Sequence, residues 1–360
     1  MDDQQRVVTD NQVVSVHTGA TGVQLFQFAP EAYTGITWGR TQSDASQCSL
    51  QVPPADVNRL DIIEPWRDWS SVYDDDTGQL LWTGPITAVS DNPRAGLSLS
   101  AKDHMCLLRA TRVPTSKRWD AVDPAYIAGE LWRYMADLHQ LGRAKPVVLP
   151  DPDGKRYDFQ THTDDATLDT VFGDLAGMGL KYTVVSGTPV LGPLTKEPVA
   201  TLSEDDFEGD GITFVKDGTS TVNDVLVRGQ TNLAKARTDY HGLNLQGIVN
   251  RDSMKGLSNI QQAAEAYVQE TGAVRTRLVL QPNTVLKPTA PVSIAELMPS
   301  SRFVIEARGI RQLFELTAVD VERSPSGTAV RVTMVSVNPK LELVDDKTGP
   351  NLTQGAAGSR

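Results

Sequence analysis

Alternation of apolar and polar side chains is the feature of this sequence that most restricts its fold. It occurs in CSLQV (48–52), LSLSA (97–101), TFV (213–215) and AVRVTMVSV (329–337). A period of two residues belongs to a strand with one buried and one solvated face. Glycine-containing turns punctuate the chain at residues 74–78, 91–96, 186–189, 217–220 and 324–327. Such strands and turns are typical of meanders and small barrels, so the sequence predicts a mainly β protein.

Three segments with a helical period interrupt the strands. The predicted N-caps are Asp123 followed by Pro124, then Asp164 or Asp165, and last Ser258 with Gln261 as a capping box. The predicted ends are Gly142, the glycines of 177–179 and Gly272. The predicted buried residues are Ile127, Leu131, Met135 and Leu138, then Leu168, Val171, Phe172 and Leu175, and last Ile260, Ala264, Tyr267 and Val268. We therefore expect α+β parts within the β protein.

The order of these elements predicts the domain organisation. Because the first two helices lie together between regions of strands, we expect an inserted α/β domain between two mainly β regions. The expected domains are a first β-barrel domain over 1–117, the inserted domain over 118–200, and a second β-barrel domain over 201–344 with an accessory helix at 258–271. Residues 345–360 have no apolar periodicity and are expected to form a flexible tail.

Composition and charge exclude several functions. The 360 residues include no apolar run of the roughly 20 residues that span a bilayer, so we expect no membrane insertion. Lysine and arginine number 34 against 45 aspartates and glutamates, and the basic residues are dispersed. Tight wrapping of nucleic acid needs clustered cations, so it is disfavoured. The N-terminal residues lack the basic and apolar regions of a secretory signal, and we expect synthesis in a cytoplasm without export.

Two acidic stretches resemble the start of a calcium-binding loop. In the first, counting from Asp74 puts Gly78 at position 5 and Pro85 at position 12, where oxygen ligands are needed. The second, DPDGKRYDF (151–159), puts Lys155 at position 5. Both motifs fail. Residues 74–78 are therefore predicted to be the tip of a hairpin whose carboxylates stay solvated.

Other signals of catalysis or metal binding are weak. Cys48 and Cys106 lie in apolar stretches without metal-ligand spacing, and both are expected to be buried free thiols. His162 and Asp164 are the nearest approach to a metal pair, but Asp164 is better explained as a helix cap. The sequence contains no GxSxG, HExxH or phosphate-binding loop, and the glycines of 177–179 close a helix. We expect no enzymatic activity, and no catalytic, cofactor-binding or metal-binding residue.

Six tryptophans leave three interpretations open. They are Trp38, Trp66, Trp69, Trp82, Trp119 and Trp132. Core packing is favoured, a subunit interface is second, and a carbohydrate platform is third, because no two show the same-face spacing of a platform. Trp82 is expected in the core or in a subunit contact. Gly84, two residues later, is expected to let its strand bend.

The order of several motifs resembles a known family. The segments WGRTQSDASQCSLQVPP (38–54), LLWTGPITAVS (80–90) and GLSLSAKDHMCLLRATRV (96–113) resemble the N-terminal hub domain of minor tail proteins from long-tailed phages of actinobacteria. Lys102, Leu107, Leu108 and Arg109 fit the last of these motifs. Residues 168–193, 207–230 and 329–339 are similar to the family's inserted domain, the entry to its second barrel and its closing strand. The likeness therefore touches most of residues 38–340.

The resemblance implies a baseplate hub at the tail tip, similar in fold to the hub of contractile tails. Such hubs are trimers whose six small β-barrels form a pseudo-hexameric ring, and two such hub barrels with the inserted domain are expected here. The implied partners are two further copies of the chain, the tail tube or distal tail protein above, and tip, spike or fibre proteins below. DNA is expected to pass through the ring without specific binding, along neutral or acidic residues. The implied location is the virion, after assembly in the host cytoplasm.

Two other functions are compatible with a tail protein. One is a tail-tip module that binds host-surface carbohydrate as a lone domain. The other is a tail-associated hydrolase, which is disfavoured because the chain ends soon after its closing strand. A structural hub is the expected function, since nothing in the sequence commits the chain to catalysis.

Overall fold

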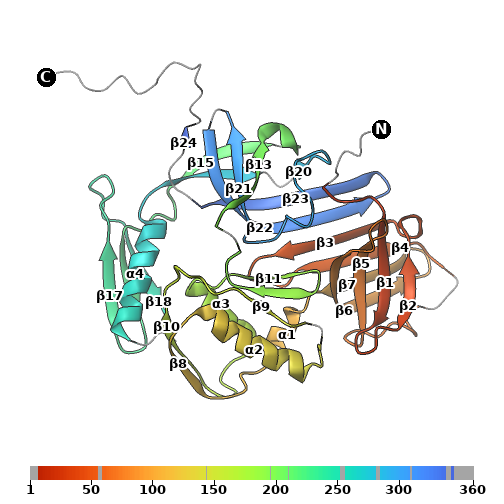
Figure 1. Cartoon of the computed structure of the whole chain (residues 1–360), viewed down its shortest axis with the longest axis horizontal. Helices are drawn as coiled ribbons and strands as arrows, with labels where there is room; N and C mark the ends of the chain where they lie inside the picture. The colour runs from red at the N-terminus through yellow and green to blue at the C-terminus, as the bar shows by residue number, and fades with distance from the viewer. Residues whose placement is uncertain are drawn as a thin grey trace.

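The computed structural model describes residues 7–343 apart from 56–58, 143, 195, 210, 252–255, 281–283, 309 and 338–341. The predicted flexible tail, 345–360, lies outside the described residues. Strands dominate the fold, as predicted, and they gather in two lobes (Figure 1). The first, here called the sheet lobe, holds one large sheet, and the second, the α/β lobe, holds the four α-helices and three small sheets.

The sheet lobe is built around a 14-stranded sheet. Its strands follow the order β14 (Phe207–Glu208), β20 (Val285–Leu286), β23 (Gly327–Ser336), β22 (Ile310–Ser324), β3 (Gly35–Thr41), β4 (Gln47–Val52), β7 (Gly96–Lys102), β6 (Leu80–Asn92), β5 (Asp68–Asp74), β1 (Gln12–Thr18) and β2 (Gln24–Phe28). Off this path, β21 (Arg302–Ala307) pairs with β22 and with β13 (Pro198–Ser203), and β24 (Glu342–Leu343) pairs with β22. Among the described strands, the two at the ends of this path, β14 and β2, do not pair with each other, so the sheet is open. The structure therefore does not confirm the two closed barrels expected from the sequence.

Among the described strands, one antiparallel pairing joins the N-terminal and C-terminal halves of the large sheet. Strand β22 runs beside β3, with Asp320 opposite Gly39 and Glu322 opposite Thr37. One core lies under both halves, and it includes Trp38 and Leu99 from the first and Phe314 from the second. Arg40, also on β3, is 1% exposed and donates hydrogen bonds to the backbone carbonyls of Ile294, Leu297 and Leu81. A buried cation therefore helps to hold the two halves together.

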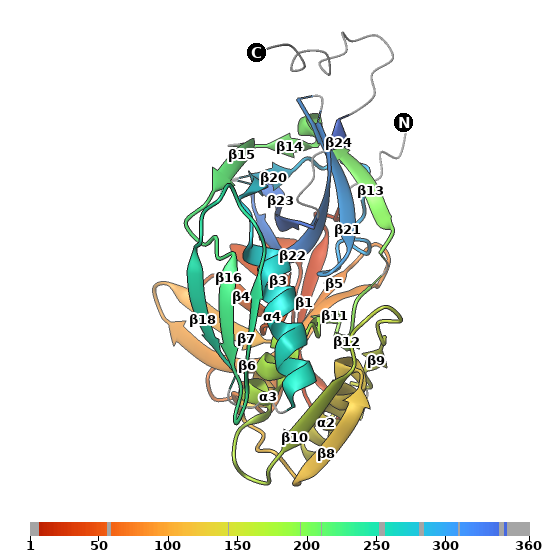
Figure 2. The same cartoon turned by 90° about the vertical axis from the view of Figure 1, so that its left-hand side faces the viewer.

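The α/β lobe has a core of its own. It contains α1 (Cys106–Arg109), β8 (Lys117–Val122), α2 (Pro124–Leu138), β9 (Val147–Val148), β10 (Tyr157–Thr161), α3 (Leu168–Gly177), β11 (Tyr182–Val185), β12 (Thr188–Leu191), β16 (Asp224–Arg228), β17 (Leu233–Arg237), β18 (Gln246–Asn250) and α4 (Leu257–Thr271). Its core joins residues of 105–191 with residues of 225–268, and α4 lies beside β16 (Figure 2). Part of the predicted second barrel domain thus packs against the predicted insertion, and the domain boundaries stay a prediction. Short elements complete the fold: β15 (Ile212–Asp217), β19 (Arg275–Leu280), and 3₁₀ turns at Pro30–Ala32 and Glu204–Asp206.

Helix predictions were partly correct. Asp123 caps α2 through its side chain, which accepts the N–H of Ala125. The helix ends at Leu138 instead of reaching Gly142, and Leu138 is 53% exposed, so its predicted burial was wrong. Its position faces solvent because the core contacts of α2 end with Met135 and Ala136.

The predicted caps of the other two helices were wrong. Helix α3 begins after Thr167, while Asp164 lies outside it in a left-handed turn with φ 58° and pairs with Arg112 at 3.2 Å. Helix α4 begins after Gly256, which has φ 86°, and Ser258 lies inside the first turn. In both cases the chain enters the helix through a turn that a capping-residue pattern does not reveal. The predicted ends at 177–179 and at Gly272 are confirmed.

Candidate functional site

The exposed face of the large sheet forms a broad polar surface. Side chains on the other face, such as Trp38, Leu50 and Val321, fill the core. The outward positions of β23, β22, β3, β4, β7 and β6 carry Ala329, Arg331, Thr333, Ala318, Asp320, Glu322, Thr37, Gly39, Gln47, Ser49, Gln51, Ser98, Ser100, Lys102, Ala88 and Ser90. We call this set the polar sheet face.

Cross-strand neighbours make the polar sheet face continuous. Ser49 lies opposite both Thr37 and Ser100, and Gln51 donates a hydrogen bond to the hydroxyl of Ser98 at 2.8 Å. Between β3 and β6, Lys102 is the one charged residue of the set. The other three, Asp320, Glu322 and Arg331, lie on β22 and β23. Two cations therefore balance two anions, and hydroxyl and amide groups make up most of the surface.

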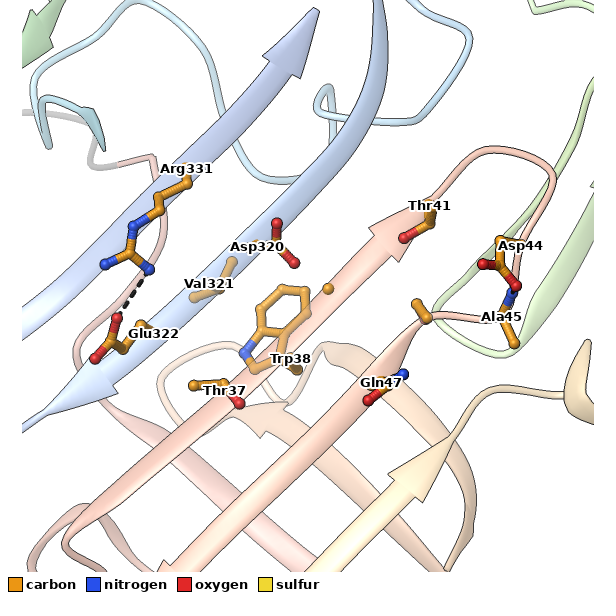
Figure 3. A pocket seen from close by; sticks show the side chains of 12 residues that line it. Thr37, Trp38, Thr41, Asp44, Ala45, Gln47, Asp320, Val321, Glu322 and Arg331 are labelled. Carbon is orange, nitrogen blue, oxygen red and sulfur yellow. Dashed lines mark hydrogen bonds and ion pairs between the residues drawn. The ribbon is translucent and has the colours of Figure 1, made fainter. Parts of the chain in front are cut away.

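A pocket of about 340 Å³ opens in this face where β22, β3 and the loop before β4 meet (Figure 3). Glu322 and Arg331 form an ion pair of 2.8 Å at one side, and Asp44 and Gln47 lie at the other (Figure 3). Gly39 allows β22 to approach closely, because a Cβ there would lie 2.7 Å from the carbonyl oxygen of Val319 and 2.8 Å from the Asp320 carboxylate. Loss of water around its carboxyl raises the pKa of Asp320, while the charge of Arg331 acts in the opposite direction.

The chemistry of this pocket is that of hydrogen bonding. Glu322 is paired with Arg331, and the hydroxyls and amides of the pocket present donors and acceptors to whatever lies against the sheet. Across the residues that the structure describes, no group of three or more His, Cys, Asp or Glu side chains is arranged to hold a metal ion. Within the same residues, no helix combines the length and apolar character that crossing a bilayer needs.

A second pocket, of about 490 Å³, lies between the two lobes. Trp66 is 54% exposed at its rim and has φ 69°, a left-handed conformation that is strained for a bulky residue. Arg109 and Asp169 form an ion pair of 3.3 Å in its wall. An exposed aromatic ring beside fixed polar groups is suited to a ring-shaped polar ligand or to a partner's side chain.

The tryptophans divide as the favoured interpretation predicted, with one exception. Trp38, Trp82, Trp119 and Trp132 are buried, and Trp69 is half-buried. Trp82 belongs to the core, where its indole N–H donates to the hydroxyl of Ser46 at 3.0 Å. Trp66 is the exception. Gly84 allows β6 to approach the end of β7 closely, because a Cβ at this position would collide with the backbone of Lys102.

The carboxylates of the two acidic stretches take part in hydrogen bonds and ion pairs with other protein groups. Residues 74–78 are the tip of the β5–β6 hairpin, as predicted, but their carboxylates are not merely solvated. Asp74 accepts the N–H of Asp76, and Asp76 accepts hydrogen bonds from Thr9 and Asn11 at 3.0 and 2.9 Å. In the second stretch, Asp151 and Asp153 both pair with Lys196, at 3.3 and 2.6 Å.

The cysteines and the His162–Asp164 pair, considered above as candidate reactive or metal-binding residues, do not form a site together. Cys48 is a buried free thiol as predicted, whereas Cys106 is only half-buried, and burial raises the pKa of each thiol to about 12. The prediction for Cys106 was wrong because its position borders the second pocket. His162 is exposed and makes no pair with Asp164. The polar sheet face was not predicted, although the polar residues that alternate with apolar ones in strands such as 48–52 and 97–101 are its signal in the sequence.

Comparison with solved structures gives the fold a class, that of phage tail proteins. The tail protein from Neisseria meningitidis has a TM-score of 0.63 and 16% identity, with 91% of this chain and 98% of that chain covered. The 43 kDa tail protein of prophage MuSo2 from Shewanella oneidensis has a TM-score of 0.62 and 12% identity, with the same coverage. The prophage tail protein gp18 from Listeria monocytogenes has a TM-score of 0.52 and 12% identity, with 92% and 95% covered. No protein-family model matches the sequence, and no curated protein matches it.

Proposed function

We propose that this chain is a structural component of a phage tail, a trimeric baseplate hub that joins the six-fold tail tube to three-fold tip proteins. The shared fold supports a tail component. The observation that carries the hub role is the β22–β3 pairing, which places a sheet segment from each half of the chain side by side. Three chains then present six such segments, the number that a six-fold tube requires. Actinobacterial phages, named by the sequence resemblance, are the proposed source.

The polar sheet face is the proposed wall of the DNA channel. A surface that releases counterions from phosphates would hold DNA by its cations, so a channel through which DNA slides needs a balanced charge. The face offers this balance, with Lys102 and Arg331 against Asp320 and Glu322. Its hydroxyls and amides keep a layer of water that moves easily.

Mass and symmetry test the hub. Purified full-length protein, or protein bound to its tail neighbours, should have the mass of three copies of the 39.1 kDa chain. Images of the particle should show the chain with three-fold symmetry at the tail tip, between the tube or distal tail protein and the tip, spike or fibre proteins. If the chain is strictly monomeric and absent from any particle, the hub role is refuted and only the likeness of fold to tail proteins remains.

Basic substitutions test the channel. Phage carrying Gln47→Lys with Ser100→Lys should eject DNA more slowly, and the delay should shrink as salt is raised because salt screens the new contacts. Gln140→Lys with Thr163→Lys, at exposed positions of the α/β lobe, is the matched control and should eject at the normal rate. Equal ejection by both double variants would place the channel wall elsewhere.

Carbohydrate binding at the tail tip is the second candidate function. Exposed Trp66, beside the Arg109–Asp169 ion pair, is the observation in its favour. A glycan array should then show binding by the wild-type chain that Trp66→Ala abolishes and that the distant variant Tyr126→Ala leaves intact. Binding to no glycan would remove this candidate without affecting the hub.

Absence of catalysis is part of the proposal. It rests on the motifs that the sequence lacks, and purified protein should give only background release of fragments from host cell walls. Robust degradation that copurifies with the chain would contradict it.

A further inference from the structure

The small sheet β17–β16–β18 has one face that packs and one that does not. Val225, Val227 and Ala234 point to one side, where they join Ile260 and Val268 of α4 in the second core. On the other side the outward positions are half-buried or exposed. They carry Asp224, Leu226, Arg228, Leu233, Lys235, Arg237, Gln246, Ile248 and Asn250. We call this side the basic sheet face.

Its charge is opposite to that of the whole chain. The formal net charge of the protein is −11, yet here three cations stand against one carboxylate. Among the described residues, neither Arg228 nor Lys235 nor Arg237 has a carboxylate within ion-pair distance; Asp224, opposite Arg237, instead accepts a hydrogen bond from Gln246 at 3.1 Å. The cations are thus free to meet an acidic surface.

Aliphatic side chains lie between these cations. Leu233 and Ile248 are 58% and 61% exposed, and Leu226 lies directly opposite Ile248. Exposed aliphatic groups surrounded by charge are the composition of a protein interface, because they lose water on contact while the charges set the register. A surface for single-stranded nucleic acid would instead offer aromatic rings for stacking, and the face has none.

We propose that the basic sheet face is a contact between copies of this chain, docking against an acidic surface of the next copy. The inference rests on the proposed trimer and names one of its contact surfaces. Figure 1 places β17 and α4 at one side of the molecule and β1, β2 and β5 at the other. Exposed Asp75 and Asp76 lie at the tip that follows β5, so acidic groups are available on that far side. Such a head-to-tail contact closes a ring of three when each copy is rotated by 120° relative to the next.

Charge reversal tests this contact in the full-length protein. Arg228→Glu with Lys235→Glu places no new carboxylate opposite Asp224 and should weaken self-association at least about tenfold in sedimentation velocity. Leu233→Ser with Ile248→Ser should weaken it through lost apolar contact. The matched control, Arg94→Glu with Lys145→Glu, makes the same change of charge at exposed positions elsewhere and should associate normally. Circular dichroism should confirm that all variants fold.

Carbodiimide cross-linking identifies what the face touches. In a mixture of isotope-labelled and unlabelled protein, Lys235 should form links to carboxylates of a different copy, and high salt should suppress them. Three results would each overturn the proposal.

The first is wild-type protein that stays monomeric on its own. This result would leave trimerisation on the particle to be tested by imaging. Normal trimers of both double variants would refute the surface but keep the hub. Loss of binding to DNA or anionic vesicles with intact self-association would assign the face to another partner.

Discussion

Asp103 and His104 are adjacent buried ionisable residues that lie where the two cores meet. Asp103 accepts hydrogen bonds from the N–H and hydroxyl of Ser46 and from the N–H of Met105. The ring of His104 lies 4.8 Å from that of Trp69, and within the described residues its Nδ1 finds no hydrogen-bond partner. Burial raises the pKa of Asp103 to about 6 and lowers the pKa of His104 to about 4.

These two shifts act on stability with opposite signs. Between about pH 4 and 6 the folded protein holds the Asp103 proton more tightly than the unfolded chain, so this residue lowers the free energy of unfolding as pH rises. A shift of about two units corresponds to about 3 kcal/mol. His104 does the reverse, because between about pH 4 and 6.5 the unfolded chain binds its proton more tightly, which is again worth about 3 kcal/mol. In the wild-type protein the two contributions nearly cancel.

Single substitutions should therefore expose large pH dependences. Urea unfolding of Asp103→Asn should show stability rising by about 3 kcal/mol from pH 4 to 6.5, relative to wild type, because only the His104 contribution remains. His104→Phe, which keeps an aromatic ring beside Trp69, should show a fall of similar size from pH 4 to 6. Slopes are compared instead of absolute stabilities, so a general loss of packing does not matter. Variants whose slopes both match wild type would refute this account of the buried pair.

The other predictions concern single contacts. Arg40→Met removes the hydrogen bonds to three carbonyls and should cost about 3 kcal/mol in urea unfolding; an unchanged midpoint would contradict it. Gly84→Ala collides with the backbone of Lys102 and should cost about 3 kcal/mol, whereas Gly142→Ala, with open space around it, should change stability by less than about 0.5 kcal/mol. Asp123→Ala removes the cap of α2, the hydrogen bond from the N–H of Asp151 and the ion pair with Arg156, and should lower stability by about 2 kcal/mol; no change in the melting temperature would argue against these roles.

Local structure was the most predictable part of this protein. Alternation at 48–52 and 97–101 predicted β4 and β7, and the helical period predicted the faces of α2 and α4 almost completely. In both cases the period arises because one face of the strand or helix is buried, and the polarity of each residue shows which face it lies on. The missed starts of α3 and α4 depend on turn geometry at Asp164 and Gly256, which both have a positive φ, and neither helix has a side-chain hydrogen bond at its N-cap.

Long-range pairing was not predictable. Strands β22 and β3 are separated by most of the chain, and any outward-alternating strand could have taken the place beside β3. The same holds for the α/β lobe, where residues of 225–268 complete a core that begins at residue 105. Sequence order therefore suggested an insertion between two barrels, whereas packing brings a segment of the second β region onto the inserted helices.

The two exposed sheet faces show where function can be sought in such a fold. A buried face must be apolar whatever the protein does, so its residues report only on folding. An exposed face is free of that demand, and the two faces of this chain differ: one balances Lys102 and Arg331 with two carboxylates, while the other gathers three cations around aliphatic groups. Folding alone gives no reason for this difference. A surface along which DNA slides and a surface that holds an acidic neighbour would require these two opposite compositions.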